Sequence, residues 1–311
     1  MFKTLITIPL GYILGFIYDF VLNYGWSLVV FTLAIKIILL PLGLKQQKSM
    51  TRMQLVQPKV QEIQKKYEND KNKQSEEMMK LYKEYNISPM GGCLPMLIQL
   101  PILFGLYRVI YQPLTYMLHM SADQVAELTK KCMGNADFVA KFGDITAGAR
   151  QTAEIAIAKA EGLVNFDFLG LDLSMSPSLG RFDWLWLIPV LAGVTTYITS
   201  KITTWINAKD KEDEEPKKPV RVLSPDQKPA GNGNESTMKT MTYVMPLMTT
   251  WIAFSFPAAL GLYWIMGNVV SIGQTFLLNG YYSKKLKAEF EVLEEEKAVK
   301  KAEKMKRRKR G

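Results

Sequence analysis

The chain has 311 residues, 48% of them apolar, and a formal net charge of +10. Two Cys and one His are too few for a disulfide-stapled domain or a Cys/His metal site. Residues 240–283 form a run of 44 residues without Asp, Glu, Lys or Arg. Because apolar runs of about 18 residues or more are typical of membrane spans, this run disfavours a freely soluble enzyme. The positive charge favours an anionic partner such as lipid headgroups, nucleic acid or a ribosome.

The N-terminal segment 1–22 is apolar but is not a clear membrane span. It contains Pro9, two glycines and a late acidic residue, Asp19. We find no A-x-A-like cleavage site of a signal peptide in it. An interfacial helix lying on the bilayer is the preferred interpretation, while a signal-like segment and a sixth span stay open.

Five membrane spans are predicted in the core of the chain, residues 23–280. The first run would be about 28 Å long as a helix, close to the roughly 30 Å of a hydrocarbon core. The last apolar run is too long for one crossing, and Pro257 and Gly261 mark a turn within it. The five spans are expected at about 26–44, 90–118, 184–206, 240–256 and 259–279.

The distribution of basic residues predicts the orientation. Segments 45–88, 201–239 and 279–311 hold 10, 8 and 12 Lys and Arg residues, whereas the loop 119–182 holds six together with eight acidic residues. Five spans place the three basic segments on one side of the membrane and the loop on the other. By the positive-inside rule, the basic segments and the C-terminus lie in the cytoplasm, and the loop and residues 1–22 face outward.

The basic segment after the first span has helical periodicity. Apolar residues at spacings of three and four, from Met53 to Tyr67, form a coiled-coil-like seam over its first half. A polar turn follows, and Ser75 is the expected N-cap of a second helix. The pattern predicts an antiparallel helical hairpin over residues 46–86, which is either a solvated connector or an arm for docking or gating.

The other extramembrane pieces carry few chemical signals. Two helical stretches are expected in the extracellular loop 119–182, one capped by Ser121 and one over the Ala-rich residues 146–161. The cytoplasmic linker 207–237 has the mixed charge, Pro and Gly of a disordered segment. The basic cytoplasmic tail, residues 281–311, either anchors the last span or contacts ribosomal RNA or anionic lipid. Its candidate contact residues are Lys306, Arg307, Arg308, Lys309 and Arg310.

Lys36 is the charged residue placed deepest in a predicted span. A lysine at the centre of a transmembrane helix costs about 2.5–3.5 kcal/mol on insertion scales. The cytoplasmic end near Lys45 is about 13 Å away along the helix, beyond the roughly 6 Å reach of a Lys side chain. No Asp or Glu lies in any other predicted span to pair with it. We therefore expect Lys36 to face a hydrated cavity that attracts acidic groups, with a snorkelled side chain as the alternative.

Uncharged polar residues lie at membrane depth in the other spans. Gln99 is in the second, Thr195 and Thr199 are in the third, and Asn268 is in the last. Each is compatible with a helix–helix hydrogen bond or with the lining of a groove. The sequence contains no P-loop, H-E-x-x-H or G-x-S-x-G motif. We therefore expect no enzyme, no nucleotide hydrolysis, no metal and no cofactor.

Four blocks of the sequence together resemble the YidC/Oxa/Alb family of membrane protein insertases. They occur in the family's order and cover about residues 20–280. The blocks are IILLPL directly after Lys36, SPMGGCLPMLIQLPI at 88–102, FDFLGLDL at 166–173 and FSFPAALGLYW at 254–264. One such block alone is a weak signal, whereas four in order on five spans are a strong one.

This resemblance implies an all-α polytopic membrane protein of the bacterial plasma membrane. Five transmembrane helices would surround a hydrophilic groove open to the cytoplasm and to lipid, and a cytoplasmic helical hairpin would follow the first span. The implied partners are nascent membrane proteins, the lipid bilayer and the ribosome, and cooperation with a Sec-type translocon stays open. The chain resembles the short Gram-positive type. The implied groove residues are Lys36, Gln99, Thr195, Thr199, Trp264 and Asn268.

The chain departs from the family pattern at its groove cation. The family usually has Arg there, and Lys36 keeps the charge but loses bidentate pairing. Attraction of an acidic client flank needs a positive charge and not the two-pronged guanidinium group of Arg. We therefore expect the groove mechanism to work with Lys36. The rival hypothesis is a transporter or channel for a small anion that binds at Lys36. The paired repeats and larger number of spans typical of transporters are not found, and we expect no small-molecule substrate.

Overall fold

The computed structural model describes residues 3–85, 87, 94–145, 150–178, 180, 183–212 and 233–308. The chain divides into two compact units. Unit 1 comprises residues 1–39, 96–201 and 239–271, and unit 2 comprises residues 40–95, 202–238 and 272–311.

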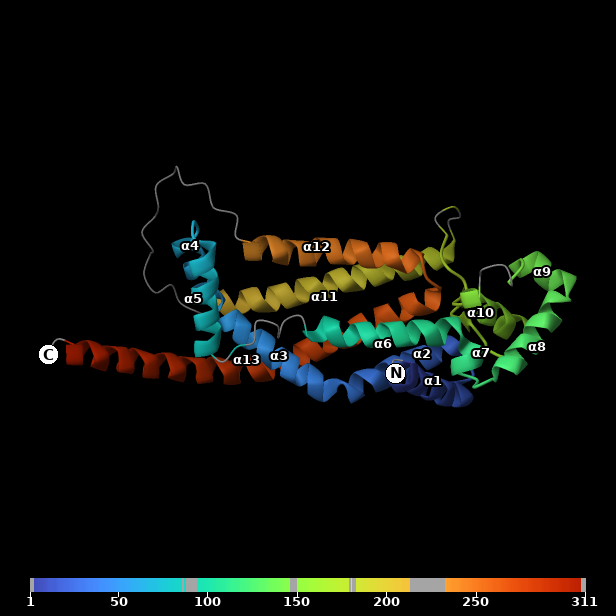
Figure 1. Ribbon diagram of the computed structural model, residues 1–311, viewed down its shortest axis with the longest axis horizontal. Helices are drawn as coiled ribbons and strands as arrows, with labels where there is room; N and C mark the ends of the chain where they lie inside the picture. The colour runs from blue at the N-terminus through green and yellow to red at the C-terminus, as the bar shows by residue number, and fades with distance from the viewer. Residues whose placement is uncertain are drawn as a thin grey trace. The chain divides into compact units, whose positions relative to one another are not determined.

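Unit 1 is built almost entirely from helices. Its long helices are α1 (Ile8–Val21), α2 (Tyr24–Ile38), α6 (Leu94–Tyr111), and parts of α11 (Leu187–Glu212), α12 (Gly233–Phe254) and α13 (Ala258–Arg308). A π-helical turn (Lys3–Thr7) precedes α1, and a 3-10 turn (Trp184–Trp186) precedes α11. Figure 1 shows α11 and α12 side by side. It also shows the short helices gathered at one end of this unit: α7 (Pro113–Tyr116), α8 (Ala122–Met133), α9 (Ala136–Phe142) and α10 (Arg150–Ala160).

Several helices have the length and composition of membrane spans. Within the described part of the chain, three stretches are long and apolar enough to cross a membrane, namely Lys3–Val21, Trp184–Thr203 and Ala258–Leu278. A fourth results if α2 and α3 (Leu40–Leu55) count as one broken span. The expected number of five therefore stays a prediction. The segment 1–22 is long enough to cross rather than lie on the bilayer, and its placement also stays open.

The first predicted span, 26–44, is not one helix. α2 ends at Ile38 and α3 begins at Leu40. Pro41 accounts for the break, because its ring clashes with the carbonyl group four residues earlier and it has no N–H to donate. Residues 26–44 therefore do not form one continuous helix, and their crossing of the membrane stays a prediction.

The second predicted span, 90–118, also divides. α6 ends at Tyr111 and α7 begins at Pro113, as expected when a proline constrains the residue before it. Residues 90–93 of this prediction lie outside the described residues. The helix proposed for this span therefore ends seven residues earlier than predicted, at Tyr111 rather than Leu118, and its crossing of the membrane stays a prediction.

The last two predicted spans are separated by the expected turn. α12 ends at Phe254 and α13 begins at Ala258, on either side of Pro257. α13 then continues as a single helix to Arg308. The predicted boundary between the last span and the tail, at 280, is therefore not a break in the helix.

The segment 119–182 contains the helices expected in it. Ser121 caps α8 through a capping box with Gln124, as predicted. α10 occupies the described part of the Ala-rich stretch. Cys132 is buried with a free thiol.

Residues 166–173, predicted to belong to an all-α fold, include two short strands. β1 (Asp167–Phe168) pairs antiparallel with β2 (Leu171–Asp172). Leu169 and Gly170, between them, have φ angles of 51° and 80°. Two central residues with positive φ match the right-handed twist of a tight β-hairpin. Two-residue strands are too short to show an alternating pattern, so no pattern in the sequence predicts them.

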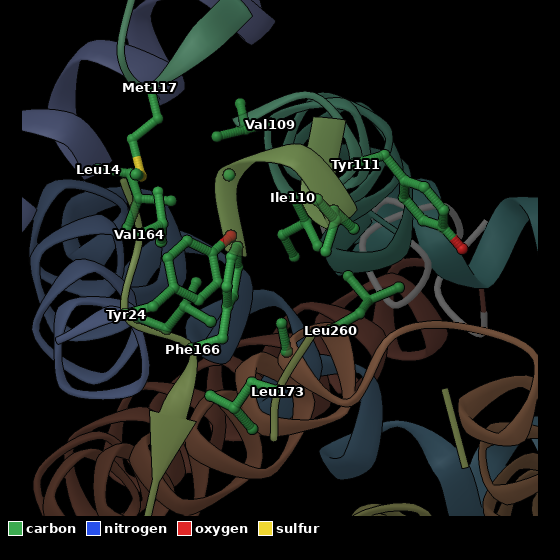
Figure 2. Close-up of a cluster of buried hydrophobic side chains, with 14 of the residues drawn as sticks. Leu14, Tyr24, Val109, Ile110, Tyr111, Met117, Val164, Phe166, Leu173 and Leu260 are labelled. Carbon is green, nitrogen blue, oxygen red and sulfur yellow. The ribbon is translucent and has the colours of Figure 1, made fainter. Parts of the chain in front are cut away.

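The core of unit 1 joins the first helices to this hairpin. Figure 2 shows the rings of Tyr24 and Phe166 facing one another, with their centroids 4.8 Å apart. Leu14 from α1 and Leu260 from α13 belong to the same buried cluster. This packing fixes the end of the unit at which α2 and α13 begin.

Unit 2 contains α3, α4 (Gln57–Lys66) and α5 (Lys71–Glu84). α4 and α5 pack on one another through a small apolar cluster that includes Val60 and Leu81. Asp70 caps α5, since its carboxylate accepts a hydrogen bond from the backbone N–H of Lys73 at 3.0 Å. The helix thus begins four residues before Ser75, the predicted cap. The cytoplasmic location of this pair stays a prediction.

The predicted disordered linker 207–237 is helical at both described ends. α11 continues to Glu212, and α12 begins at Gly233. Residues 207–212 contain no Pro or Gly, and their Ala, Lys and Glu are good helix formers, which explains the extension. The rest of the predicted linker, 213–232, lies outside the described residues.

Candidate functional site

Residues 165–175, which include the strand hairpin, hold the start of α2, and we call this segment the clamp. The backbone N–H of Tyr24 donates to the carbonyl of Asn165 at 2.9 Å. The Asn23 side chain donates to the carbonyl of Asp167 at 2.7 Å. The first N–H groups of a helix lack partners within it, so the clamp satisfies one of them.

The clamp also holds the start of α13. The N–H groups of Ala258 and Ala259 donate to the carbonyls of Met175 and Leu173, at 2.9 and 3.2 Å. Two helices far apart in the sequence therefore begin at the same short segment. They run in the same direction from it, because Lys36 and Ser271, which lie 12 and 13 residues after the two helix starts, are in contact.

Gly25 allows α2 to approach the clamp closely. A Cβ atom added there would lie 2.3 Å from the ring of Phe168. The ring of Phe168 also packs edge-on against Trp26. Only glycine fits this position without displacing a buried ring.

The shared starting point brings Lys36 and Ser271 to the same depth. Lys36 lies 12 residues after the first residue of α2, and Ser271 lies 13 residues after the first residue of α13. At 1.5 Å per residue these positions are about 18 and 20 Å from the clamp. The clamp thus determines which residues of the two helices lie opposite one another.

The ammonium group of Lys36 is held by a neutral oxygen. Its Nζ donates to Ser271 Oγ at 2.8 Å, and that hydroxyl donates to the carbonyl of Gly267 at 2.7 Å. The Lys36 side chain is half-buried. Among the residues that the structure describes, no carboxylate forms an ion pair with it. The cation is therefore oriented without being neutralised.

Asn268 forms a second polar contact between helices. Its Nδ2 donates to Thr195 Oγ1 at 3.1 Å and to Thr196 Oγ1 at 2.8 Å. The Thr195 hydroxyl donates within α11 to the carbonyl of Leu191, so its oxygen remains free to accept. Thr199 donates to the carbonyl of Thr195 at 2.8 Å. Of the predicted residues, Asn268 and Thr195 are thus brought together, and Thr199 lies one turn further along.

Three residues of α13 form a row on one face of the helix. Trp264, Asn268 and Ser271 follow the spacing i, i+4 and i+7, which places side chains one above another. We call them the polar row. Trp264 is half-buried and packs against the core of unit 1. The sequence analysis missed Ser271, a small hydroxyl common in helix contacts. The spacing from Trp264 was the signal that could have found it.

Gln99 reaches α13 outside the polar row. Its Nε2 donates to Tyr263 Oη at 2.9 Å. Tyr263 directly precedes Trp264, and neighbouring residues of a helix point about 100° apart. The structure therefore joins Gln99 to the same helix as the other predicted residues but on a different face.

The predicted contact residues of the tail cannot be placed as side chains. The backbone of Lys306, Arg307 and Arg308 belongs to α13. Their side chains, and all of Lys309 and Arg310, lie outside what the structure describes.

Comparison with known proteins identifies the family. The family model described as "60Kd inner membrane protein" matches residues 16–285. The chain belongs to this family. The matched residues include the clamp, Lys36 and the polar row.

Relatives within the 60Kd inner membrane protein family carry the name membrane protein insertase. "Membrane protein insertase YidC 2" of Listeria innocua is 30% identical over 98% of this chain and 83% of its own length. "Membrane protein insertase YidC" of Clostridium perfringens is 31% identical over 85% of this chain and 81% of its own. The protein of that name from Syntrophus aciditrophicus is 30% identical, but the chain spans only 36% of its length. The family and the apolar helices indicate a multi-pass protein of a bacterial membrane.

Proposed function

We propose that the protein is a membrane protein insertase that moves nascent hydrophobic segments from the cytoplasm into the bilayer without nucleotide hydrolysis. The observation that carries the proposal is the contact of Lys36 with Ser271, at 2.8 Å. A carboxylate partner would cancel the charge of the lysine. A hydroxyl partner orients the ammonium group and leaves its charge to act on an incoming acidic group.

The proposed path follows the polar contacts of unit 1. The polar flank of a client enters a hydrated groove from the cytoplasm and is drawn toward Lys36. Asn268 and Ser271 offer hydrogen-bonding groups along the same helix face. The hydrophobic part of the client then leaves sideways into lipid. Removal of its apolar surface from water, at about 25 cal/mol per Å², drives this step.

The clamp supports a groove closed at one end. It ties the N-terminal ends of α2 and α13 together through backbone hydrogen bonds. In the predicted orientation this end faces outward. A client flank that has reached Lys36 would have only the clamp region left to pass. The distance that it must still cross through the membrane would therefore be short.

The proposed partners are nascent membrane proteins and, through residues 306–310, the ribosome. Cooperation with a Sec-type translocon is compatible with this scheme and is not required by it. We further propose that α4 and α5 lie in the cytoplasm, as the hairpin predicted from the charge distribution.

Reconstitution of the pure protein in liposomes tests the proposal, with a single-span client whose translocated tail is acidic. Loss of a charge attraction worth about 1–2 kcal/mol lowers the rate roughly five- to thirtyfold, and we expect this for Lys36→Ala. Lys36→Arg should insert the client normally. The matched control is Lys130→Ala, which removes an exposed charge from α8.

A client with a neutral tail provides the second comparison, because it should insert equally with and without Lys36. Equal insertion of the acidic client by Lys36→Ala would contradict the proposed role of the charge. Uptake of a small anion by liposomes that do not insert the client would favour the transporter hypothesis instead.

A further inference from the structure

A later part of α13 packs on α5 and α4 within unit 2, as Figure 1 shows for α5. The ring of Phe290 stacks on that of Tyr85, with centroids 5.2 Å apart and an angle of 26° between the planes. Leu286, one turn earlier, is only 2% exposed. Phe290 joins the same apolar cluster as Val60 and Leu81. The helix α13 thus adds an aromatic ring to the apolar cluster between the other two helices.

Glu294 makes the polar part of this contact. Its carboxylate accepts hydrogen bonds from Lys59 Nζ at 2.7 and 2.8 Å, and it also accepts one from the hydroxyl of Tyr85. The Lys59 ammonium lies 4.8 Å from the centroid of the Tyr85 ring. Phe290 and Glu294 are four residues apart and so share one helix face. The surface therefore recognises an aromatic ring and a carboxylate at that spacing.

A second ion pair and a cavity lie beside these residues. Arg52 of α3 contacts Glu289 at 3.4 Å. The cavity measures about 210 Å³, and its lining includes Arg52, Tyr85, Leu286 and Phe290. The segment 286–294, which we call the latch segment, therefore does not fill the surface that it covers.

The ion pairs of the contact are exposed enough to be exchanged. The side chains of Lys59 and Glu294 are 34% and 37% exposed, and those of Arg52 and Glu289 are 35% and 43% exposed. Ion pairs exposed to this degree contribute little to stability. The latch segment is part of the same chain, so its high effective concentration can keep a weak contact closed.

We propose that the surface formed by Arg52, Lys59, Val60, Leu81 and Tyr85 is a docking site for a helix with an aromatic residue and a carboxylate four residues apart. The latch segment fills this site in the resting protein as a built-in competitor. The exchanging partner is an amphipathic acidic helix of an incoming client. Only this identification of the partner rests on the proposed function.

A peptide of residues 283–298 tests the site directly. It is labelled with a fluorophore, and its binding to the full-length protein in nanodiscs of zwitterionic lipid is measured by anisotropy. In the wild type the latch segment occupies the site. A protein with Phe290→Ala and Glu294→Ala should expose it and bind the peptide at least tenfold more tightly.

Charge exchange tests which surface binds the peptide. We call the protein with Phe290→Ala and Glu294→Ala the opened protein. Adding Lys59→Glu to it should abolish the tighter binding, and a peptide with Glu294→Lys should restore that binding. Lys65→Glu is the matched control, because Lys65 is exposed on the same helix. A peptide with the ring and carboxylate moved to a spacing of five should not compete, whereas a client helix with a spacing of four should.

Equal affinity of the peptide for the wild type and the opened protein would overturn the proposal, and so would tight binding that Lys59→Glu leaves unchanged. Competition by the spacing-five peptide would overturn the assignment of the recognised pattern. These outcomes are independent of the insertion assay with Lys36→Ala. If the protein binds the peptide but inserts no client, the docking surface stands and the insertase proposal is refuted.

Discussion

Two lysines, one in each unit, are held by opposite chemistry. Lys36 in unit 1 is half-buried and donates to a serine hydroxyl. Lys59 in unit 2 is more accessible and donates to a glutamate and a tyrosine. The better-paired lysine thus lies where water could have solvated it. The less-paired one lies in a segment where charge is costly.

The charge of Lys59 maintains a contact within the protein, whereas the charge of Lys36 is available to an incoming group. In Lys59, burial lowers the pKa, but the hydrogen bonds to Glu294 and Tyr85 outweigh it and raise the pKa. In the resting protein its charge is thus paired with a carboxylate of the same chain. Within the described part of the chain no carboxylate pairs with Lys36, which is why we propose that its charge acts on the client.

The largest expected effect comes from changing the clamp without changing Lys36. Gly25→Ala places a methyl group against the ring of Phe168, and overpacking of this kind costs about 1–3 kcal/mol. It should shift α2 relative to α13 and so separate Lys36 from Ser271. We expect a lower melting temperature in detergent together with a loss of acidic-client insertion like that of Lys36→Ala.

Two variants control for this result. Gly43→Ala places a methyl group in open space on α3 and should leave insertion unchanged. Phe168→Ala combined with Gly25→Ala removes the clash and should recover part of the insertion activity. If Gly25→Ala inserts the acidic client normally, the alignment of α2 and α13 by the clamp is not what presents Lys36.

A buried carboxylate in unit 1 is the counterpart of Lys36. Glu154 is 6% exposed and accepts hydrogen bonds from the Thr115 N–H at 2.8 Å and the Thr115 hydroxyl at 2.7 Å. Glu154→Ala leaves that buried N–H without a partner, at a cost of about 1–2 kcal/mol. Thermal unfolding in detergent should show a lower melting temperature for Glu154→Ala than for the wild type, whereas Glu154→Gln should show no such loss.

The pH dependence of stability sharpens this test. Burial raises the pKa of Glu154 above its ordinary value of 4.5, and the Thr115 hydrogen bonds only partly oppose the rise. The folded protein therefore holds the proton more tightly than the unfolded chain. This contribution is complete below pH 4.5 and is lost as the pH rises through the raised pKa. The wild type and Glu154→Gln should have equal melting temperatures at low pH, and the wild type should have the lower melting temperature at neutral pH. A constant difference between them would mean that the carboxylate stays ionised throughout.

The sequence predicted features with local causes and missed those with tertiary ones. Ser121 caps α8 through its own side-chain hydroxyl, and Pro257 separates α12 from α13 through its own backbone; the sequence predicts both. Lys36 was found because a charge in an apolar run needs an explanation. Ser271 becomes significant only through the alignment of α2 with α13. That alignment depends on hydrogen bonds between residues more than 140 positions apart, such as Asn23 and Asp167.

The smallest expected effects are on stability, and they test the comparison of the two lysines most directly. Lys36→Ala leaves the Ser271 hydroxyl bonded to the carbonyl of Gly267, so the melting temperature should hardly change. Lys59→Ala removes a half-exposed ion pair and should cost about 1 kcal/mol or less, while insertion of the acidic client continues. Melting temperatures and insertion rates measured on the same preparations should therefore rank the two variants in opposite order. If Lys36→Ala were instead the less stable protein, its insertion defect would follow from damaged packing. The proposal that the charge of Lys36 acts on the client would then be contradicted.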